Sequence, residues 1–393
     1  MISPFSKRPA MALLAAFALL LAAANLRGGI VVVGPLVESI RADLQLSASA
    51  FSLLTTVPLL CFAVVSIFVP FFARAFRPQS LVVGALLLVS LGVLLRVTQW
   101  FPVILVGTVF LGSAIALLNV LIPGLVKAFF PNHLGLMTGL YSVTLSLGAG
   151  FGVFLAVPLL QSFGSWRYPM LLWAALPILS ILLWLPLFKE RAIGRPANPL
   201  KVTLWRDKTA WAITVYMGLQ SFLFYSLATW LPKIYMESGL SSELAGQATA
   251  LINLLSIPFN LFVPIIAAKL KQQFVLVWLI SGFIFAGLLG LLLAPGAYPM
   301  LWSSLIGMGV GGSLALALTL FVLRAHDIHQ ATALSAMAQS LGYLLAASGP
   351  FLLGFVHDIS HQWQAALYLL LALQCVQLLA GLYAAKPSFV KSD

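Results

Sequence analysis

The most informative segment of the chain is residues 102–126, PVILVGTVFLGSAIALLNVLIPGLV, which contains no Asp, Glu, Lys or Arg. A helix needs about 20 predominantly apolar residues to cross the roughly 30 Å hydrocarbon core of a bilayer. Residues 102–126 meet this requirement. They are therefore predicted to form a transmembrane helix.

Eleven similar runs flank this segment, and short polar gaps separate them. All are predicted to be helices, because a backbone in lipid must satisfy its own hydrogen bonds and no run alternates like a membrane barrel strand. The first run follows basic residues, as a signal peptide does, but it continues to Ile40 and is predicted to be retained. The predicted spans are 10–36, 49–71, 80–99, 102–126, 135–160, 169–188, 210–232, 245–266, 274–294, 299–323, 331–355 and 364–385.

The composition excludes a soluble protein. Of the 393 residues, 62% are hydrophobic and 8% are charged, whereas soluble domains carry about 25% charged residues. The net charge of +12 does not predict a nucleic-acid partner, because the basic residues lie in short gaps rather than on one solvated face. Cys61 and Cys375 both fall inside apolar runs, so neither a disulfide framework nor a zinc site is predicted.

The basic residues predict the orientation, since cytoplasmic loops carry the excess of Lys and Arg. When the gaps are assigned alternately to the two sides, the side with both termini holds most of the 21 Lys and Arg. The gaps on the opposite side hold Arg41, Arg167 and Lys233. Both termini are therefore expected to be cytoplasmic, in a multi-pass protein of a bacterial inner membrane.

The longest polar gap lies between spans six and seven and divides the chain into halves. We predict an N-terminal six-helix bundle at 1–188, a basic cytoplasmic linker at 189–208 and a C-terminal six-helix bundle at 209–393. Similar residues recur at an offset of 197 residues: Lys127 and Arg324, Gly112 and Gly309, Trp166 and Trp363. A duplicated six-helix unit explains this echo, and parallel repeats typify one large transporter architecture.

Two arginines fall inside predicted spans. Arg27 lies deep in the first span, where a guanidinium costs about 3 kcal/mol on insertion scales and usually faces a wet cavity or a ligand. No acidic residue lies inside a predicted span to neutralise it. We therefore predict that Arg27 binds the substrate. Arg96 lies one turn from the end of its span and is expected to extend to the membrane surface.

Neutral polar residues recur one helical turn apart on the faces of several spans. This pattern predicts a wet cavity, and hydrogen bonding between helices is the alternative. Gln339 and Tyr343 are expected to face the same cavity as Arg27. The residues predicted to bind substrate beside Arg27 are Asn25, Asn119, Ser221, Tyr225, Gln339 and Tyr343.

Motifs of enzymes are absent, so we predict no catalytic residue, no cofactor and no ATP site. The spacing of His357, Asp358 and His361 would suit a metal on a helix, but a solvated loop is the better interpretation, and no metal site is predicted. Transport must then be driven by gradients. An uncoupled facilitator or channel for a small solute is the alternative function.

No residue is an obvious site for the coupling proton. Proton-driven transporters ordinarily titrate a carboxylate within their spans, and no predicted span contains one. Glu38, on the same predicted helix as Arg27, is the first coupling candidate, and Asp358 beside His357 is the second. The third possibility needs no protein group: an anionic substrate crosses with a proton or exchanges for a counter-anion. Protons or a counter-anion are thus the candidate partners beside the substrate.

The twelve spans, the basic central gap and the repeat together resemble the major facilitator superfamily, over nearly the whole chain. The more specific motifs resemble its cyanate-permease and nitroimidazole-exporter branch. These motifs are Asn25-Leu26-Arg27 with Gly34-Pro35, Leu53-Leu54-Thr55-Thr56-Val57-Pro58, Trp230-Leu231-Pro232, residues 333–347 (ALSAMAQSLGYLLAA), Gly349-Pro350 and His357-Asp358.

The resemblance implies two six-helix halves, a substrate site near the membrane midplane and alternating access by rocking. It also implies a small planar solute, such as cyanate or a nitro-heterocycle. Arg27 suits such a solute, because a guanidinium fork binds planar oxyanion-like groups at two points. The predicted function is secondary active transport of a small planar anionic or electron-rich organic solute by a monomer in the lipid bilayer.

Overall fold

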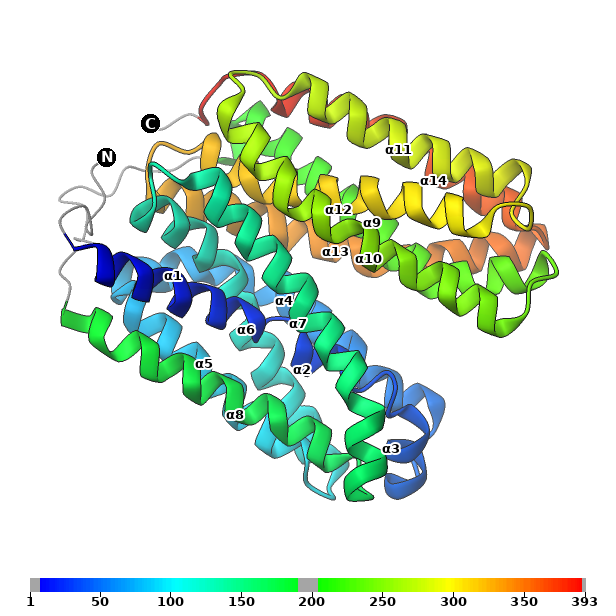
Figure 1. The fold of residues 1–393 in the computed structure, drawn as a ribbon, viewed down its shortest axis with the longest axis horizontal. Helices are drawn as coiled ribbons and strands as arrows, with labels where there is room; N and C mark the ends of the chain where they lie inside the picture. Colours follow the sequence, from blue (N-terminus) through cyan, green and yellow to red (C-terminus); the bar gives the residue numbers. More distant parts are fainter. Residues whose placement is uncertain (1–7, 190–203, 391–393) are drawn as a thin grey trace. The chain divides into compact units, whose positions relative to one another are not determined.

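The structure is a computed structural model that describes residues 8–189 and 204–390. Most of the predicted basic linker, 189–208, lies outside the described residues. Figure 1 shows the helices in chain order. They are α1 Pro9–Ala24, α2 Gly28–Val31, α3 Val37–Leu44, α4 Ala48–Ala75, α5 Pro78–Arg96, α6 Phe101–Phe129, α7 Leu134–Phe163, α8 Arg167–Trp184, η1 Leu185–Lys189, η2 Leu204–Arg206, α9 Lys208–Glu237, α10 Ser242–Lys269, α11 Phe274–Leu293, α12 Pro299–Leu323, α13 Ile328–Ser360 and α14 Trp363–Ala384.

The predicted fold class is confirmed. Twelve segments of the described chain are helical, long and apolar enough to cross a membrane, and the described residues form no strand. Predicted and observed bounds are the same for the tenth span, 299–323. The seventh span differs, because α9 continues through Pro232 to Glu237 instead of ending at residue 232.

Local signals set the starts of several helices. Pro78 and Pro299 lie in the first turn of α5 and α12, where a missing backbone N–H costs no intrahelical hydrogen bond. Asp207 accepts a 2.8 Å hydrogen bond from the backbone N–H of Ala210 at the start of α9. Ser241 caps α10 in the same way. Such caps satisfy N–H groups that have no partner inside the helix.

The helices form two compact units. The first unit contains Met1–His133, Leu140–Leu200 and Asp327–Ala336, and the second contains Leu134–Gly139, Lys201–His326 and Met337–Asp393. Each unit therefore includes a short segment from the other half of the sequence. The predicted boundaries at 188 and 209 stay a prediction.

Two glycines that lie 197 residues apart bring helices together in the same way in the two units. A Cβ added to Gly152 of α7 would lie 2.9 Å from the carbonyl oxygen of Gly28 in the first span. A Cβ added to Gly349 of α13 would lie 3.1 Å from the carbonyl oxygen of Phe222 in α9. Since small residues permit such close approach of transmembrane helices, the sequence echo extends to helix packing.

Arg324 joins three helix ends in the second unit. Its Nε donates to the carbonyl oxygen of Ala384 at 3.0 Å, and its Nη2 donates to Ala385 at 3.0 Å and to the side chain of Gln273. Burial lowers the pKa of Arg324 to about 10. The charge is compensated by carbonyl oxygens at the C-terminal end of α14, where the helix dipole is negative.

Candidate functional site

The first membrane span is broken at the predicted substrate anchor. Helix α1 ends at Ala24, the chain turns through residues 25–27, and α2 begins at Gly28 (Figure 1). The predicted first span, 10–36, is confirmed as a candidate membrane span over Pro9–Val31, but it is not one continuous helix. The backbone N–H of Leu26 bonds to the carbonyl of Ala23, three residues back, at 3.0 Å. This tighter turn ends the α-helix, and the glycine pair that follows has a low helix propensity.

Two neighbouring helices pack closely against the break. The indole of Trp173 in α8 lies over Gly28, where an added Cβ would be 2.0 Å from Cη2 of the ring. On α7, an added Cβ at Gly148 would lie 2.5 Å from the carbonyl oxygen of Ala24. Gly148 and Gly152 are therefore close-packing residues, since both meet the backbone of the first span.

Asn25 is buried beside the break and directs its amide into the first unit. Its Nδ2 donates to the carbonyl of Leu21 at 2.7 Å and to Oγ of Ser180 in α8 at 3.0 Å. Its Oδ1 is buried and accepts no hydrogen bond from the described residues. The structure therefore gives the Asn25 donor a role in attaching the break to α8, and its role in substrate binding stays a prediction.

Arg27 is half-buried at the start of α2. Its carbonyl oxygen accepts hydrogen bonds from the N–H groups of Ile30 at 3.0 Å and Val31 at 3.1 Å, which fixes its backbone as the residue before α2. The guanidinium is thus carried by a backbone that neighbouring helices hold in place. A planar fork of five N–H donors in this setting is suited to a carboxylate-like or nitro-like group.

Arg96 also contacts the backbone beside the break, and this contact was not predicted from the sequence. Its side chain is fully buried, so the expectation that it extends to the membrane surface is wrong. Its Nη1 donates to the carbonyl oxygen of Gly29 at 2.6 Å, while Nε and Nη2 have no partner among the described residues. The cause is the close approach of α5 and α6, where an added Cβ at Gly107 would lie 2.6 Å from the carbonyl of Gly92.

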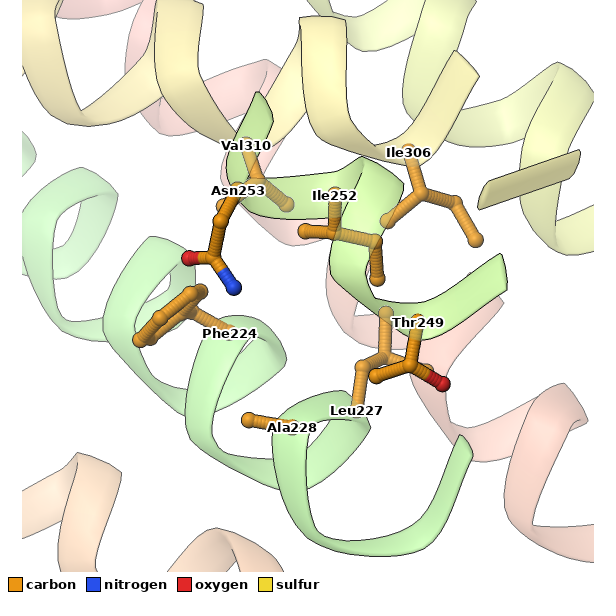
Figure 2. Close-up of a pocket in the computed structure, with 8 residues that line it drawn as sticks. All are labelled: Phe224, Leu227, Ala228, Thr249, Ile252, Asn253, Ile306 and Val310. Atoms are coloured by element: carbon orange, nitrogen blue, oxygen red, sulfur yellow. The ribbon is translucent and has the colours of Figure 1, made fainter. Parts of the chain in front are cut away.

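The second unit contains a small pocket between three helices. Its volume is about 110 Å³. Figure 2 shows the amide of Asn253 pointing toward the side of the pocket where the ring of Phe224 lies. The Asn253 side chain makes no hydrogen bond within the described part of the chain, and it is largely exposed. The lining residues are Phe224, Leu227 and Ala228 of α9, Thr249, Ile252 and Asn253 of α10, and Ile306 and Val310 of α12.

The pocket is mostly apolar with one available amide. Thr249 donates its hydroxyl proton to the carbonyl of Ala245 at 2.8 Å, so its donor is occupied. Asn253 therefore provides the amide donors and acceptor of the lining, beside an aromatic face. Such a pocket suits a small planar group with one polar edge. Sequence reasoning did not assign Asn253 to substrate binding.

The other predicted binding residues lie on the helices expected for them. Asn119 is buried in α6 of the first unit. In the second unit, Ser221 is buried on α9 and donates to Oε1 of Gln220 at 3.1 Å, while Gln339 and Tyr343 are buried on α13. The ring of Tyr225 packs edge-on against Phe224, with 5.3 Å between centroids. That Gln339 shares a cavity with Arg27 stays a prediction.

The two predicted coupling acids are both exposed. Glu38 has an 85% exposed side chain and pairs with Arg41 at 3.7 Å. It lies on α3, which residues 32–36 separate from α2, so the reason for choosing it, a helix shared with Arg27, is wrong. Asp358 is 82% exposed and lies 3.7 Å from Nδ1 of His357. No metal-binding group of three or more His, Cys, Asp or Glu occurs among the described residues.

Known proteins resemble this chain over nearly its whole length. The sequence profile of the Major Facilitator Superfamily matches residues 12–350. The 2-nitroimidazole transporter of Escherichia coli (strain K12) is 34% identical over 376 residues, which are 95% of each chain. The cyanate transport protein CynX of the same organism is 29% identical over 348 residues, 87% of this chain and 89% of the relative.

A solved structure agrees with the fold. The proton:xylose symporter XylE, bound to 6-bromo-6-deoxy-D-glucose, superposes with a TM-score of 0.76 and covers 98% of this chain and 97% of its own. The sequence identity is 13%. At this identity the similarity concerns the fold alone.

Proposed function

Because the chain belongs to the major facilitator superfamily of transporters, we propose that it is a secondary active transporter of a small planar solute that is anionic or electron-rich. The solute class is cyanate-like or nitro-heterocycle-like. Transport proceeds by alternating access of a site near the membrane midplane. Support for the solute class comes from two relatives, whose names give 2-nitroimidazole and cyanate as what they carry.

The observation that carries this proposal is the position of Arg27 at the break of the first span. A broken transmembrane helix leaves backbone groups without intrahelical partners at membrane depth, and transporters place substrate sites at such breaks. A guanidinium binds planar oxygen-bearing groups at two points. We assign Arg27 as the anchor of the solute, with Asn119, Ser221, Tyr225, Gln339 and Tyr343 as further binding residues.

The pocket in the second unit supports a planar solute independently. Its volume of about 110 Å³ accommodates a small ring or a group of similar size. The ring of Phe224 offers a face for stacking, and the Asn253 amide offers both a donor and an acceptor. We add Phe224 and Asn253 to the proposed binding residues.

The orientation and location follow from the same proposal. Both termini are cytoplasmic, because the short gaps on their side carry most of the Lys and Arg. The membrane is the bacterial inner membrane, and the halves 1–188 and 209–393 are the two rocking bundles, joined by the linker 189–208. The transporter works as a monomer, with protons or a counter-anion as the second partner.

A thermal-shift screen of the purified protein tests the solute class. We expect 2-nitroimidazole, cyanate or a related small planar acid to raise the unfolding midpoint, because a ligand that binds only the folded state stabilises it. At a ligand concentration of about 100 times Kd the gain is about 2.7 kcal/mol. Non-planar solutes of similar size, such as glycerol and lactate, serve as controls. A midpoint that rises only with the non-planar solutes would contradict the proposed class.

A further inference from the structure

A cluster of four side chains joins the ends of three helices in the second unit. We name it the His357 cluster: Lys233 and Glu237 of α9, His357 of α13 and Trp363 of α14. The indole N–H of Trp363 donates to Oε2 of Glu237 at 2.7 Å. Nε2 of His357 lies 3.6 Å from the same oxygen, and Nζ of Lys233 lies 3.6 Å from Oε1.

The imidazole of His357 is enclosed by this cluster. Its ring stacks on the indole of Trp363, with 4.1 Å between centroids and 28° between planes. Its side chain is 16% exposed, so water still reaches it. A protonated imidazole in this place gains both an ion pair with Glu237 and a cation–π contact with Trp363. A neutral imidazole gains neither.

The first unit has a matching cluster in which an arginine takes the place of the histidine. Trp166, 197 residues before Trp363, donates its indole N–H to Oδ2 of Asp43 at 3.0 Å, and Arg167 pairs with the same oxygen at 2.9 Å. The Trp166 hydrogen bond and Arg167 hold the pKa of Asp43 below its ordinary value. Arginine stays charged at every physiological pH, so the ion pair between Arg167 and Asp43 does not depend on pH in this range. The second unit places a histidine beside its acid, and histidine is the side chain that exchanges a proton within the physiological pH range.

One end of α13 is attached to α9 at two places. Pro350 lies inside the helix, and its carbonyl oxygen accepts a 2.7 Å hydrogen bond from the indole of Trp230 in α9. Beyond Pro350, an added Cβ at Gly354 would lie 2.8 Å from the same indole. The segment after the proline is thus tied to α9 at Trp230, and the pair of His357 with Glu237 is a second tie. Only the second tie depends on a proton.

We propose that His357 is a proton-binding site that ties the end of α13 to α9 when it is protonated and releases it when it is neutral. The proton adds to Nε2, which faces Glu237. The charged groups around it are Glu237 and Lys233 on α9 and Asp358 on its own helix, while His361 follows in the loop and α14 contributes the neutral indole of Trp363. The role in transport rests on the proposed function, because α9 and α13 also carry Ser221, Tyr225, Gln339 and Tyr343.

A measurement without any solute tests the proton site. Tryptophan emission of the purified protein is recorded from about pH 5 to about pH 8, the range in which histidine titrates. A protonated imidazole that stacks on an indole quenches its emission. We therefore expect the emission of wild type and of His361→Asn to change with pH, and the emission of His357→Gln to lack this change. The matched control is suitable because His361 has a backbone φ of 53°, which asparagine tolerates. An unchanged titration in His357→Gln overturns the proposal.

A second variant keeps the test decisive if His357→Gln does not fold. Glu237→Gln retains an oxygen that accepts the Trp363 hydrogen bond but removes the negative charge. We expect the midpoint of the emission change to move to lower pH, because the imidazolium loses its ion pair. A midpoint that stays in place contradicts a proton held by Glu237.

Transport assays then separate this inference from the proposed function. In vesicles, wild-type uptake of radiolabelled 2-nitroimidazole is expected to differ by about threefold between about pH 5.5 and about pH 7.5, the size given by a partly exposed ion pair. His357→Gln is expected to lose this difference but to keep exchange at equal pH. If wild type transports nothing while the emission titration depends on His357, the proton site stands and the proposed solute fails. If His357→Gln transports with the wild-type pH dependence, the inference fails and the proposed function stands.

Discussion

Replacing Arg27 with lysine is expected to weaken solute binding by about tenfold to a hundredfold while the protein still folds. A two-point hydrogen bond to a charged group contributes about 1.5–3 kcal/mol, and 1.4 kcal/mol corresponds to a factor of ten. Lysine keeps the positive charge but lacks the planar fork, so it retains only one-point attraction. The dissociation constant of the solute with the largest thermal shift is measured by titration of monodisperse protein.

Arg41→Lys is the matched control for this experiment. Arg41 lies on α3 in the same unit, where it pairs with Glu38 at 3.7 Å and donates from Nε to the carbonyl oxygen of Leu46 at 3.4 Å. Its replacement is expected to leave the dissociation constant unchanged, because a surface pair of this kind contributes little. If Arg27→Lys binds as tightly as wild type, Arg27 is not the anchor.

Gly28→Ala is expected to destabilise the first unit and to displace the break in the first span. The new methyl group would lie 2.0 Å from Cη2 and 2.1 Å from Cζ3 of Trp173, so ring or backbone must move. Overpacking of this kind typically costs about 1–3 kcal/mol. We expect an unfolding midpoint several degrees lower and a weaker thermal shift with the solute, because Arg27 directly precedes Gly28.

Two further variants test whether contact with Trp173 causes the loss of stability in Gly28→Ala. Gly84→Ala on α5 adds a methyl group with no atom within 4 Å, and it is expected to leave stability unchanged or slightly raised. In the double variant Gly28→Ala with Trp173→Leu, the shorter side chain makes room, so the two effects should not add. Full additivity, or equal losses in Gly28→Ala and Gly84→Ala, would show that contact with Trp173 is not what requires glycine at 28.

Span positions were predictable because a membrane imposes one strong rule, a long uncharged helix. Residues 102–126 satisfied it without help from tertiary contacts, and α6 covers Phe101–Phe129. The superfamily and its cyanate and nitroimidazole branch were also predicted and are confirmed by the comparisons. The branch was identified from particular residues in its motifs, whereas hydropathy alone identifies only the spans.

The break in the first span was not predicted, because hydropathy averages over a helix that tertiary packing interrupts. Residues 25–29, NLRGG, contained the signal, a polar pair followed by two glycines. Glycine in a membrane helix is compatible with both packing and unwinding. Trp173 and Gly148, which lie more than 100 residues away in sequence, decide between them.

Arg96 and Glu237 show the same limit for charged side chains. Distance from a span end predicted that Arg96 reaches the surface, but the depth of a side chain depends on which helix covers it, and here α6 does. Glu237 was overlooked because the seventh span was predicted to end at Pro232. A proline within a membrane helix is tolerated when neighbours satisfy the freed backbone groups.

Counterflow in vesicles tests the central claim, that this protein is a carrier with alternating access. Vesicles are loaded with the unlabelled solute that gives the largest thermal shift, and a trace of labelled solute is added outside. The carrier mechanism predicts a transient accumulation of label above its equilibrium level, absent from vesicles without protein and weakened in Arg27→Lys. Label that only rises to equilibrium, at a rate linear in concentration and independent of the internal solute, would contradict the mechanism and indicate a channel.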